Sequence, residues 1–314
     1  MLEASSPAKA ILFGEHAVVY GRPAIALALD RRITITAKKG VQTRVDGGNL
    51  RMRRHRYVRW AMENFWSGEP ISFRTRSGIP GASGLGSSAA LSSSIVAILQ
   101  KMKGGWEEKA TAEQSFEVEY NVQGGASPTD TSCSTHGSGI LVTFEKREQH
   151  LWTIDKGDRT WHIHHIDPPE MDLVVGFTKR PSITHIQVGK VRDFYDRSGF
   201  ARETIDEIGD LVIEGLKALR TKDIVKLGSL MNKNHSLLSI LGVSSKELDK
   251  LKDSVENCSF GAKLTGAGGG GSIIALTDEP EKCARYIKRR GGVPYIVKNS
   301  KKGTEVKVID EGCN

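Results

Sequence analysis

The sequence contains few cysteines and no long apolar run. Its 4 cysteines among 314 residues are scattered, without the CxxC spacing of zinc modules or the density of a disulfide framework. No run of about eighteen apolar residues is present, which argues against a membrane span. The first residues also lack the basic and apolar regions of a secretory signal. We therefore expect a cytoplasmic, reduced protein that has no membrane partner.

Aromatic residues are sparse as well, at 6% of the chain, and no internal repeat or low-complexity segment is present. The hydrophobic share of 38% and the charged share of 26% are typical of a globular protein and exclude a disordered one. A chain of 314 residues can bury a large core and usually divides into two domains.

The net charge of +8 fits two kinds of partner. A positive field concentrates polyanionic substrates around an enzyme, and it also attracts nucleic acid. The densest basic run, Arg51 to Arg59, has Trp60 and Phe65 close by, as a nucleic-acid patch would. The alternative is a helix with a solvated basic face and apolar residues packed inward. We favour the helix and predict no nucleic-acid partner.

Hydrophobic periodicity indicates strands and helices in both halves of the chain. The predicted strands cover residues 8–14, 33–37, 71–76, 139–144, 172–178, 262–264, 272–276 and 305–309, and the predicted helices cover 88–102, 107–123, 200–219, 223–238, 246–257 and 281–289. The segment 145–170 mixes charge with Gly157 and the pair Pro168-Pro169, so we place a domain boundary there. The prediction is an α+β fold with domains at residues 1–160 and 161–314.

A glycine- and serine-rich segment, Gly84 to Ser88, lies directly before a predicted helix. Glycines let the backbone approach a phosphate, and the first N–H groups of a helix attract an anion. A serine hydroxyl can bind a phosphate oxygen or Mg²⁺. The segment is not a Walker A sequence, and Ala89 stands where a GxGxxG motif needs glycine. Taken alone, it is equally compatible with a glycine-rich loop that has no ligand.

Two further motifs favour a ligand. Residues Pro7 to Gly21 place Lys9, Glu15 and His16 around the end of a predicted strand. Gly266 to Gly271 lie between two predicted strands and contain four consecutive glycines. Such a run is entropically unfavourable and indicates a backbone that passes close to another group.

Together, the three motifs resemble the signatures of the GHMP kinase superfamily in order and spacing. Within it, Gly14 to Gly21 resembles the branch that phosphorylates mevalonate, in its compact archaeal form, whereas galactokinases carry an Arg-x-Asn-Glu-His type of motif there. The resemblance implies an N-terminal α/β domain with a left-handed βαβ crossover and a C-terminal ferredoxin-like domain. It also implies a cleft between them for ATP and substrate.

The resemblance implies transfer of a phosphoryl group from ATP to the C5 hydroxyl of (R)-mevalonate, for isoprenoid biosynthesis, by a homodimer. It assigns the nucleotide to the loop composed of Pro80, Gly81, Ala82, Ser83, Gly84, Leu85, Gly86, Ser87, Ser88, Ala89 and Ala90. Related kinases for phosphomevalonate or for the 3-hydroxyl of mevalonate are the near alternatives. A catalytically silent member of the fold is less favoured because the chemically active residues named below are all present.

By the same resemblance, Asp130 is the catalytic aspartate and Lys9 lies beside it, while Ser88 and Glu119 bind Mg²⁺. A cation next to the aspartate would favour its ionised form and lower the pKa of the attacking hydroxyl. Without the resemblance, Glu119 reads as one of several exposed helix carboxylates. Asp130 reads equally well as a helix N-cap.

The resemblance further implies substrate contacts by Glu15, His16, Lys179, Thr184 and Ala267. Glu15 and His16 would bind the C5 hydroxyl end of mevalonate, and Lys179 would face its carboxylate. The segment around Thr184 departs from the family pattern at His185 and Gln187, and Ser138 stands where the family has glycine.

Overall fold

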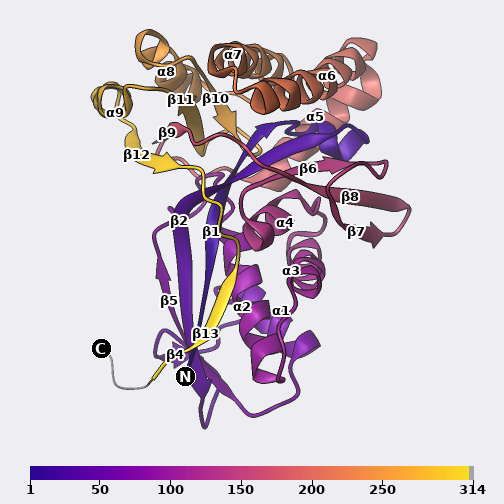
Figure 1. Ribbon diagram of the computed structural model, residues 1–314, viewed down its shortest axis with the longest axis vertical. Helices are drawn as coiled ribbons and strands as arrows, with labels where there is room; N and C mark the ends of the chain where they lie inside the picture. Colours follow the sequence, from indigo (N-terminus) through magenta and orange to yellow (C-terminus); the bar gives the residue numbers. More distant parts are fainter. Residues whose placement is uncertain (311–314) are drawn as a thin grey trace.

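The computed structural model describes residues 1–310, which form two β-sheets and helices packed on both (Figure 1). The larger sheet of the described chain contains β1 (Leu2–Phe13), β2 (Ala24–Lys39), β3 (Arg44–Val45), β4 (Gly48–Asn49), β5 (Ile71–Ser77), β6 (Gly139–Thr143), β7 (His150–Lys156), β8 (Arg159–Ile166) and β13 (Glu305–Val308). The smaller sheet contains β9 (Asp172–Phe177), β10 (Gly261–Thr265), β11 (Ser272–Leu276) and β12 (Val293–Lys298).

The helices are α1 (Arg56–Phe65), α2 (Ser87–Met102), α3 (Glu108–Gln123), α4 (Thr129–His136), α5 (Thr184–Arg197), α6 (Gly199–Thr221), α7 (Ile224–Ile240), α8 (Lys246–Ser254) and α9 (Pro280–Arg289), with short 3-10 turns η1 (Ala17–Tyr20) and η2 (Glu256–Cys258). Within residues 1–310, none of these helices combines the length and the apolar character that a membrane span requires.

Strand β2 organises the larger sheet. Residues 24–29 are buried on both faces, and the following Ile33 and Ile35 alternate with less buried threonines, which is the pattern of a strand leaving the centre of a sheet. One edge of β2 pairs with β1, and the other pairs with β6 and β5 along its two halves. The same strand therefore supports both ends of the domain.

Helix α2 lies at the centre of the helical layer on this sheet (Figure 1). Its middle is rich in alanine and serine, so it can approach β1 closely. The Ser94 hydroxyl donates to Ser6 Oγ at 2.7 Å, and Ser93 shares a 3.0 Å hydrogen bond with Thr135 of α4. These buried hydroxyls satisfy one another and fix α2 and α4 relative to β1.

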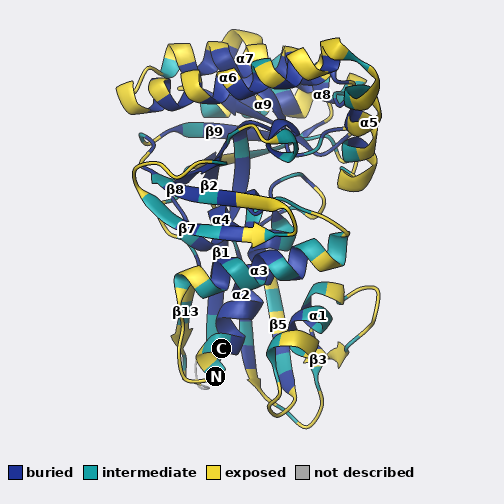
Figure 2. Ribbon diagram, turned by 90° about the vertical axis from the view of Figure 1, so that its right-hand side faces the viewer, coloured by how far each residue is buried: buried dark blue, intermediate teal, exposed yellow. Residues whose placement is uncertain are grey.

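In the second part of the fold, the antiparallel sheet runs in the order β10-β11-β9-β12. Helices α7, α8 and α9 pack on its strands, and α6 packs on α7. Figure 2 shows that α6 and α7 turn buried faces inward and an exposed face to solvent, as amphipathic surface helices do.

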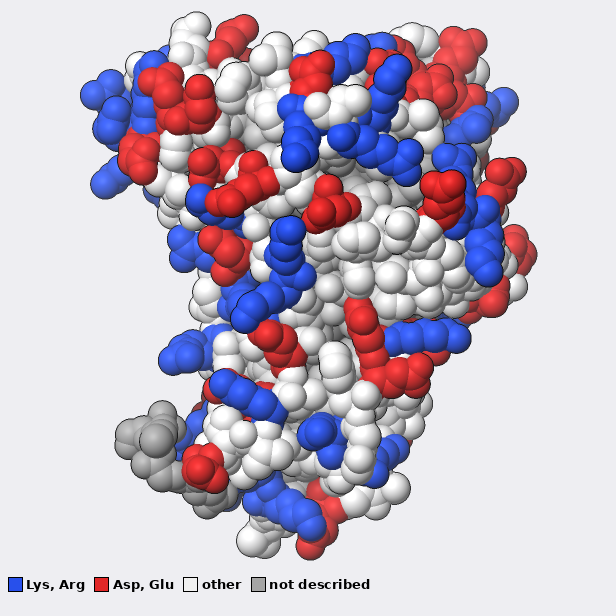
Figure 3. Space-filling model, viewed as in Figure 1, with Lys and Arg blue, Asp and Glu red and all other residues white. Residues whose placement is uncertain are grey.

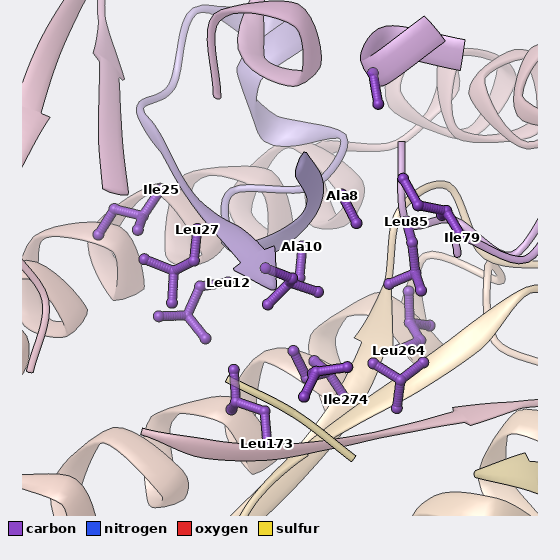
Figure 4. Close-up of a cluster of buried hydrophobic side chains, with 14 of the residues drawn as sticks. Ala8, Ala10, Leu12, Ile25, Leu27, Ile79, Leu85, Leu173, Leu264 and Ile274 are labelled. Carbon is purple, nitrogen blue, oxygen red and sulfur yellow. The ribbon is translucent and has the colours of Figure 1, made fainter. Parts of the chain in front are cut away.

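The two sheets share one hydrophobic core. Side chains of β1 and β2, including Leu12 and Leu27, meet Leu173, Leu264 and Ile274 of the smaller sheet (Figure 4). The last strand, β13, returns to pair with β1. We therefore expect the two halves to behave as one cooperative unit.

Most predicted elements are confirmed to within a few residues, and the α+β fold is confirmed. The segment 145–170, in which we place the domain boundary and predict no strand, contains the β7–β8 hairpin. This hairpin is partly exposed and contains many polar residues. The alternation of apolar and polar residues that indicates a strand is therefore weak in the sequence. We accordingly move the proposed domain boundary from residue 160, inside β8, to residues 167–171. The handedness of the crossover stays a prediction.

Helices α4 and α5 and strand β12 were not predicted. Helix α4 consists largely of threonine and serine, which are weak helix formers. The expectation of unpaired cysteines is wrong for Cys258 and Cys283. They form a disulfide with a Cα–Cα distance of 5.7 Å across 25 residues of sequence. No local spacing could indicate this pair.

Candidate active site

Lys9 and Asp130 form the centre of the site. Lys9 Nζ lies 2.9 Å from Asp130 Oδ1, and their side chains are 2% and 31% exposed. Lys9 also donates to the carbonyl oxygen of Gly84 at 3.3 Å. A buried ammonium requires such partners. The predicted proximity of Lys9 and Asp130 is thus present in the geometry, with the carboxylate open to a ligand.

The glycine-serine loop is anchored in the core at both ends. Ile79 and Leu85 are buried among the residues that join the two sheets (Figure 4), and Ser83 donates to the carbonyl oxygen of Pro80 at 2.7 Å. Helix α2 begins at Ser87, after Gly86 with φ 69°. The loop therefore holds the N-terminus of α2 next to Lys9, as an anion site needs.

Two glycines of this loop have steric reasons to be glycine. A Cβ atom on Gly86 would lie 2.7 Å from Lys9 Cε, and a Cβ atom on Gly84 would lie 2.7 Å from the carbonyl oxygen of Thr265. Both residues have positive φ, which disfavours other side chains. The loop therefore contacts both Lys9 and strand β10.

The second glycine run, Gly266 to Gly271, makes the close approach that the sequence predicts. Gly266 lies against Gly84, Gly269 N–H donates to Val243 at 2.7 Å, and Gly271 N–H donates to Arg180 at 2.8 Å. Two glycine-rich loops, one from each domain, thus face each other across the site.

Glu119 is buried on α3, with a side-chain environment suited to a cation. Gln123 Nε2 donates to Glu119 Oε1 at 2.9 Å, and the nearby Ser88 side chain favours the ionised form of the same carboxyl group, which lowers its pKa against the larger effect of burial. Burial, and then the nearby charge of Asp130, raises the pKa of Glu119 to about 7. The alternative of an exposed helix carboxylate is wrong.

Ser88 and Glu119 fit a magnesium ion. Hydroxyl and carboxylate oxygens are the ligands that Mg²⁺ prefers, and it commonly takes only one or two from the protein. The negative charges of Glu119 and Asp130 repel each other, and a divalent cation bound near them would reduce this repulsion. Residues 1–310 contain no group of three or more His, Cys, Asp or Glu side chains with metal-binding geometry, and such a site would need none.

Glu15 has buried partners. Its carboxylate pairs with the Lys263 ammonium, and Asn234 Nδ2 donates to Oε2 at 3.1 Å. Lys263 also donates to the carbonyl oxygen of Leu264 at 2.7 Å, and its pKa is lowered by burial. These contacts join β1 to β10 and α7, so Glu15 holds the two domains together behind the site.

His16 is a buried neutral imidazole. Its Nε2 lies 3.0 Å from the carbonyl oxygen of Ala267, which places these two predicted substrate residues in contact. Burial lowers the pKa of His16 to about 4. His16 also has a positive φ of 62°, so its position in the turn after β1 is tightly specified.

Lys179 and Thr184 are exposed residues between β9 and the first turn of α5. Their segment is held against the glycine run: Ser182 Oγ donates to Gly268 at 2.7 Å, and Thr178 Oγ1 donates to Gly271 at 2.8 Å. Over residues 1–310, neither Lys179 nor Thr184 contacts the Lys9–Asp130 pair. They lie at the rim of the site.

Sequence reasoning missed three residues here: Gln123, Lys263 and Asn234. Gln123 lies four residues after Glu119, a spacing that places both on one helix face. Lys263 lies three residues before Gly266, where a charged residue in a predicted strand is itself a signal. Asn234 carries no sequence signal, because only packing brings it to Glu15.

Comparison with known proteins identifies the family. Residues 55–138 match the GHMP kinases N terminal domain, and residues 216–292 match the GHMP kinases C terminal domain. A mevalonate kinase of Methanothermobacter thermautotrophicus is 38% identical over 285 residues, covering 87% of this chain and 89% of that protein. A mevalonate kinase of Pyrococcus abyssi is 33% identical over 350 residues, covering 98% of both chains.

The structural comparison agrees. The crystal structure of the Methanococcus jannaschii mevalonate kinase superposes with a TM-score of 0.79 at 27% identity, covering 95% of this chain and 98% of that one. Both domains, and not only the phosphate loop, are therefore shared. This chain belongs to the GHMP kinase family.

Proposed function

We propose that this chain transfers the γ-phosphoryl group of ATP to the C5 hydroxyl of (R)-mevalonate, giving 5-phosphomevalonate. One observation carries the proposal: buried Lys9 and partly exposed Asp130, 2.9 Å apart, lie beside a glycine-rich helix N-terminus. Phosphoryl transfer needs a positioned hydroxyl and stabilised phosphate charge, and this arrangement supplies both. The relatives that carry the name mevalonate kinase support the choice of substrate.

We assign residues Pro80 to Ala90 to the phosphates of ATP, with the free N–H groups at the start of α2 pointing to them. Ser88 and Glu119 would hold Mg²⁺, which when bound neutralises phosphate charge. The Gly84 and Gly86 positions let the phosphates approach the backbone.

We assign the acceptor hydroxyl to Asp130. Its Oδ1 faces Lys9, and its partial exposure allows a substrate to reach the carboxylate. Asp130 accepts the hydroxyl proton or orients the hydroxyl, and the Lys9 charge stabilises the developing alkoxide.

We assign the remainder of mevalonate to the rim between the domains. His16 and Ala267 border the hydroxyl end, and Lys179 and Thr184 are placed to contact the carboxylate end. For Glu15 we propose a positioning role in place of direct substrate contact, because Lys263 and Asn234 engage its carboxylate oxygens.

A homodimer and a cytoplasmic location are further parts of this proposal. Nucleic acid is not a proposed partner. Only residues 56–59 of the basic run are helical, in α1, whose Val58 and Ala61 are buried, whereas Met52 lies outside the helix and is exposed. On the face shown in Figure 3, lysine and arginine side chains are interspersed with aspartate and glutamate, unlike the basic stripe of a nucleic-acid protein.

The test is an assay of ADP release with mevalonate, phosphomevalonate and no acceptor, followed by ³¹P NMR of the product. We expect turnover with mevalonate only, and a phosphate ester on C5. Absence of turnover at millimolar mevalonate would refute the proposal. Turnover of phosphomevalonate, or a phosphate on the 3-hydroxyl, would reassign the substrate within the same family.

A further inference from the structure

A cavity of about 200 Å³ lies between the larger sheet and helix α6. Its lining residues belong to β6, β8, the loop between β6 and β7, and α6. None of them is assigned above to ATP, magnesium or mevalonate. The cavity is therefore separate from the candidate active site.

The floor of this cavity is apolar. It consists of Leu141 of β6, Ile166 of β8 and Leu216 of α6, whose side chains are buried. Drug-sized ligands usually occupy roughly 300–1,000 Å³, so a cavity of about 200 Å³ admits only a shorter molecule. Removal of apolar surface from water on this floor favours a ligand that has a short hydrocarbon part.

Two arginines line the same cavity, one from each domain. Arg147 belongs to the loop after β6, and Arg220 belongs to the last turn of α6. Over residues 1–310, neither guanidinium group has an ion pair or a hydrogen bond. Both groups are therefore available to a ligand.

The protein holds both arginines in place. The Arg147 N–H donates to His164 Nε2 at 2.8 Å, and His164 Nδ1 lies 3.3 Å from the carbonyl oxygen of Leu141. A ring nitrogen that accepts from an N–H carries no proton, so His164 is neutral and its Nδ1–H donates to Leu141. Arg220 follows Leu216 by four residues, which places both on one face of α6.

These side chains select a particular kind of anion. The planar guanidinium group matches the geometry of a carboxylate, to which it can donate two hydrogen bonds. Glu148 also lines the cavity, and its negative charge disfavours a ligand that carries a second one. Together with the apolar floor, this favours a short monocarboxylate over a polyphosphate or a dicarboxylate.

We propose that this cavity binds a small aliphatic monocarboxylate, with its carboxylate group held by Arg147 and Arg220 and its hydrocarbon part on the apolar floor. Such a ligand would bridge the two domains, because the two arginines come from different ones. The inference goes beyond the proposed function and does not depend on it.

Three probes of similar length test the chemistry: butyrate, succinate and butanol. Saturation-transfer NMR measures their binding to the full chain. We expect butyrate to bind in the millimolar range and butanol, which lacks the charge, to bind about tenfold more weakly. Succinate should also bind more weakly than butyrate, because its second carboxylate meets Glu148.

Variants of the lining residues locate the site. Arg147→Gln and Arg220→Gln should each weaken butyrate binding about tenfold. Lys217→Gln is the matched control, because Lys217 is an exposed cation of α6 outside the cavity lining, and its butyrate affinity should stay unchanged. Glu148→Gln should strengthen succinate binding, a gain that a misfolded chain could not show.

Butyrate affinity within twofold of the unmodified chain in both arginine variants would overturn the inference, even if butyrate binds elsewhere. Butanol binding as tight as that of butyrate would overturn it as well. Mevalonate is itself a small monocarboxylate, so it is titrated in the same way. Two mevalonate molecules per chain, reduced to one by Arg220→Gln, would identify the substrate as the ligand; a single one in both would indicate another carboxylate. Failure of the chain to phosphorylate mevalonate would leave the butyrate results as they are.

Discussion

At the scale of single residues, the site depends on charged groups that are buried only because each has a partner. Lys9 is almost fully enclosed, and Asp130 and the carbonyl of Gly84 satisfy its ammonium. The side-chain amide of Gln123 donates to Glu119. Removing one member of such a set changes the chemistry of the others.

Asp130→Asn tests the catalytic assignment. The amide keeps the shape of the side chain but accepts a proton poorly, so we expect kcat to fall at least about 100-fold, while binding of an ATP analogue stays within a few fold. Steady-state kinetics and calorimetry measure the two effects. Asp155→Asn is the control, because Asp155 is exposed and its carboxylate accepts a hydrogen bond from the Thr160 hydroxyl. An Asp130→Asn variant with more than a tenth of the original kcat would contradict the assignment.

His16 predicts a pH dependence of stability. Its pKa is about 4 in the folded chain against 6.5 ordinarily, so the unfolded chain binds more protons between these values. Stability must therefore fall as pH falls through this window, by about 2 kcal/mol between pH 7 and pH 5 from this residue. His16→Asn does not titrate and tolerates positive φ. Urea unfolding at pH 7 and pH 5 should show a smaller loss of unfolding free energy in the variant than in the unmodified chain. An equal loss in both would show that His16 is not its source.

At the scale of elements, contacts with neighbouring residues fix the conformation of the phosphate loop. Gly84 and Gly86 lie where a side chain would strike β10 and Lys9, respectively. Leu85 within the loop and Ile79 just before it are buried in the core (Figure 4). The start of α2 is therefore held rigidly, which preorganises the N–H groups for an anion.

Gly86→Ala tests this rigidity. The new methyl group would lie 2.7 Å from Lys9 Cε at a φ of 69°, and we expect a loss of about 1–3 kcal/mol in stability together with weaker ATP binding. Gly105→Ala is the control, because its Cβ would have no neighbour within 4 Å. Thermal unfolding and nucleotide titration measure both. Equal behaviour of the two variants would show that Gly86 is not sterically required.

At the scale of the whole molecule, a buried ion pair joins the two domains. Glu15 and Lys263 are 1% and 0% exposed, and they connect β1 of the larger sheet to β10 of the smaller one. Since the hydrophobic core is also shared, domain separation would expose both the pair and the core. We expect one cooperative unfolding transition, with circular dichroism and fluorescence midpoints that coincide.

Lys263→Met should destabilise the chain by about 3–5 kcal/mol, because it leaves the Glu15 carboxylate buried without its cation. Adding Glu15→Gln should recover part of that loss. Lys233→Met is the control: its 2.6 Å pair with Glu207 is about half exposed, so its loss should stay below about 1 kcal/mol. Denaturant unfolding distinguishes them, and a Lys263→Met loss no larger than the control would contradict the role of the pair.

The sequence alone determined the features that depend on local pattern. Periodicity located α2, α3, α6 and α7, and the glycine-rich loops indicated where the backbone must approach another group. The resemblance to the GHMP kinases, which the three motifs carry, brought Lys9, Asp130, Ser88 and Glu119 into one hypothesis. These signals are local because helix periodicity and glycine conformation depend on a few neighbouring residues.

Only the tertiary structure decided the contacts between distant residues. The pairing of Glu15 with Lys263, the approach of Gly84 to Gly266, and the disulfide between Cys258 and Cys283 each join segments from different elements. No local pattern encodes such contacts, because they follow from how sheets and helices pack. For the same reason, the sequence pointed to Glu15, but only packing revealed that Lys263 and Asn234 engage its carboxylate.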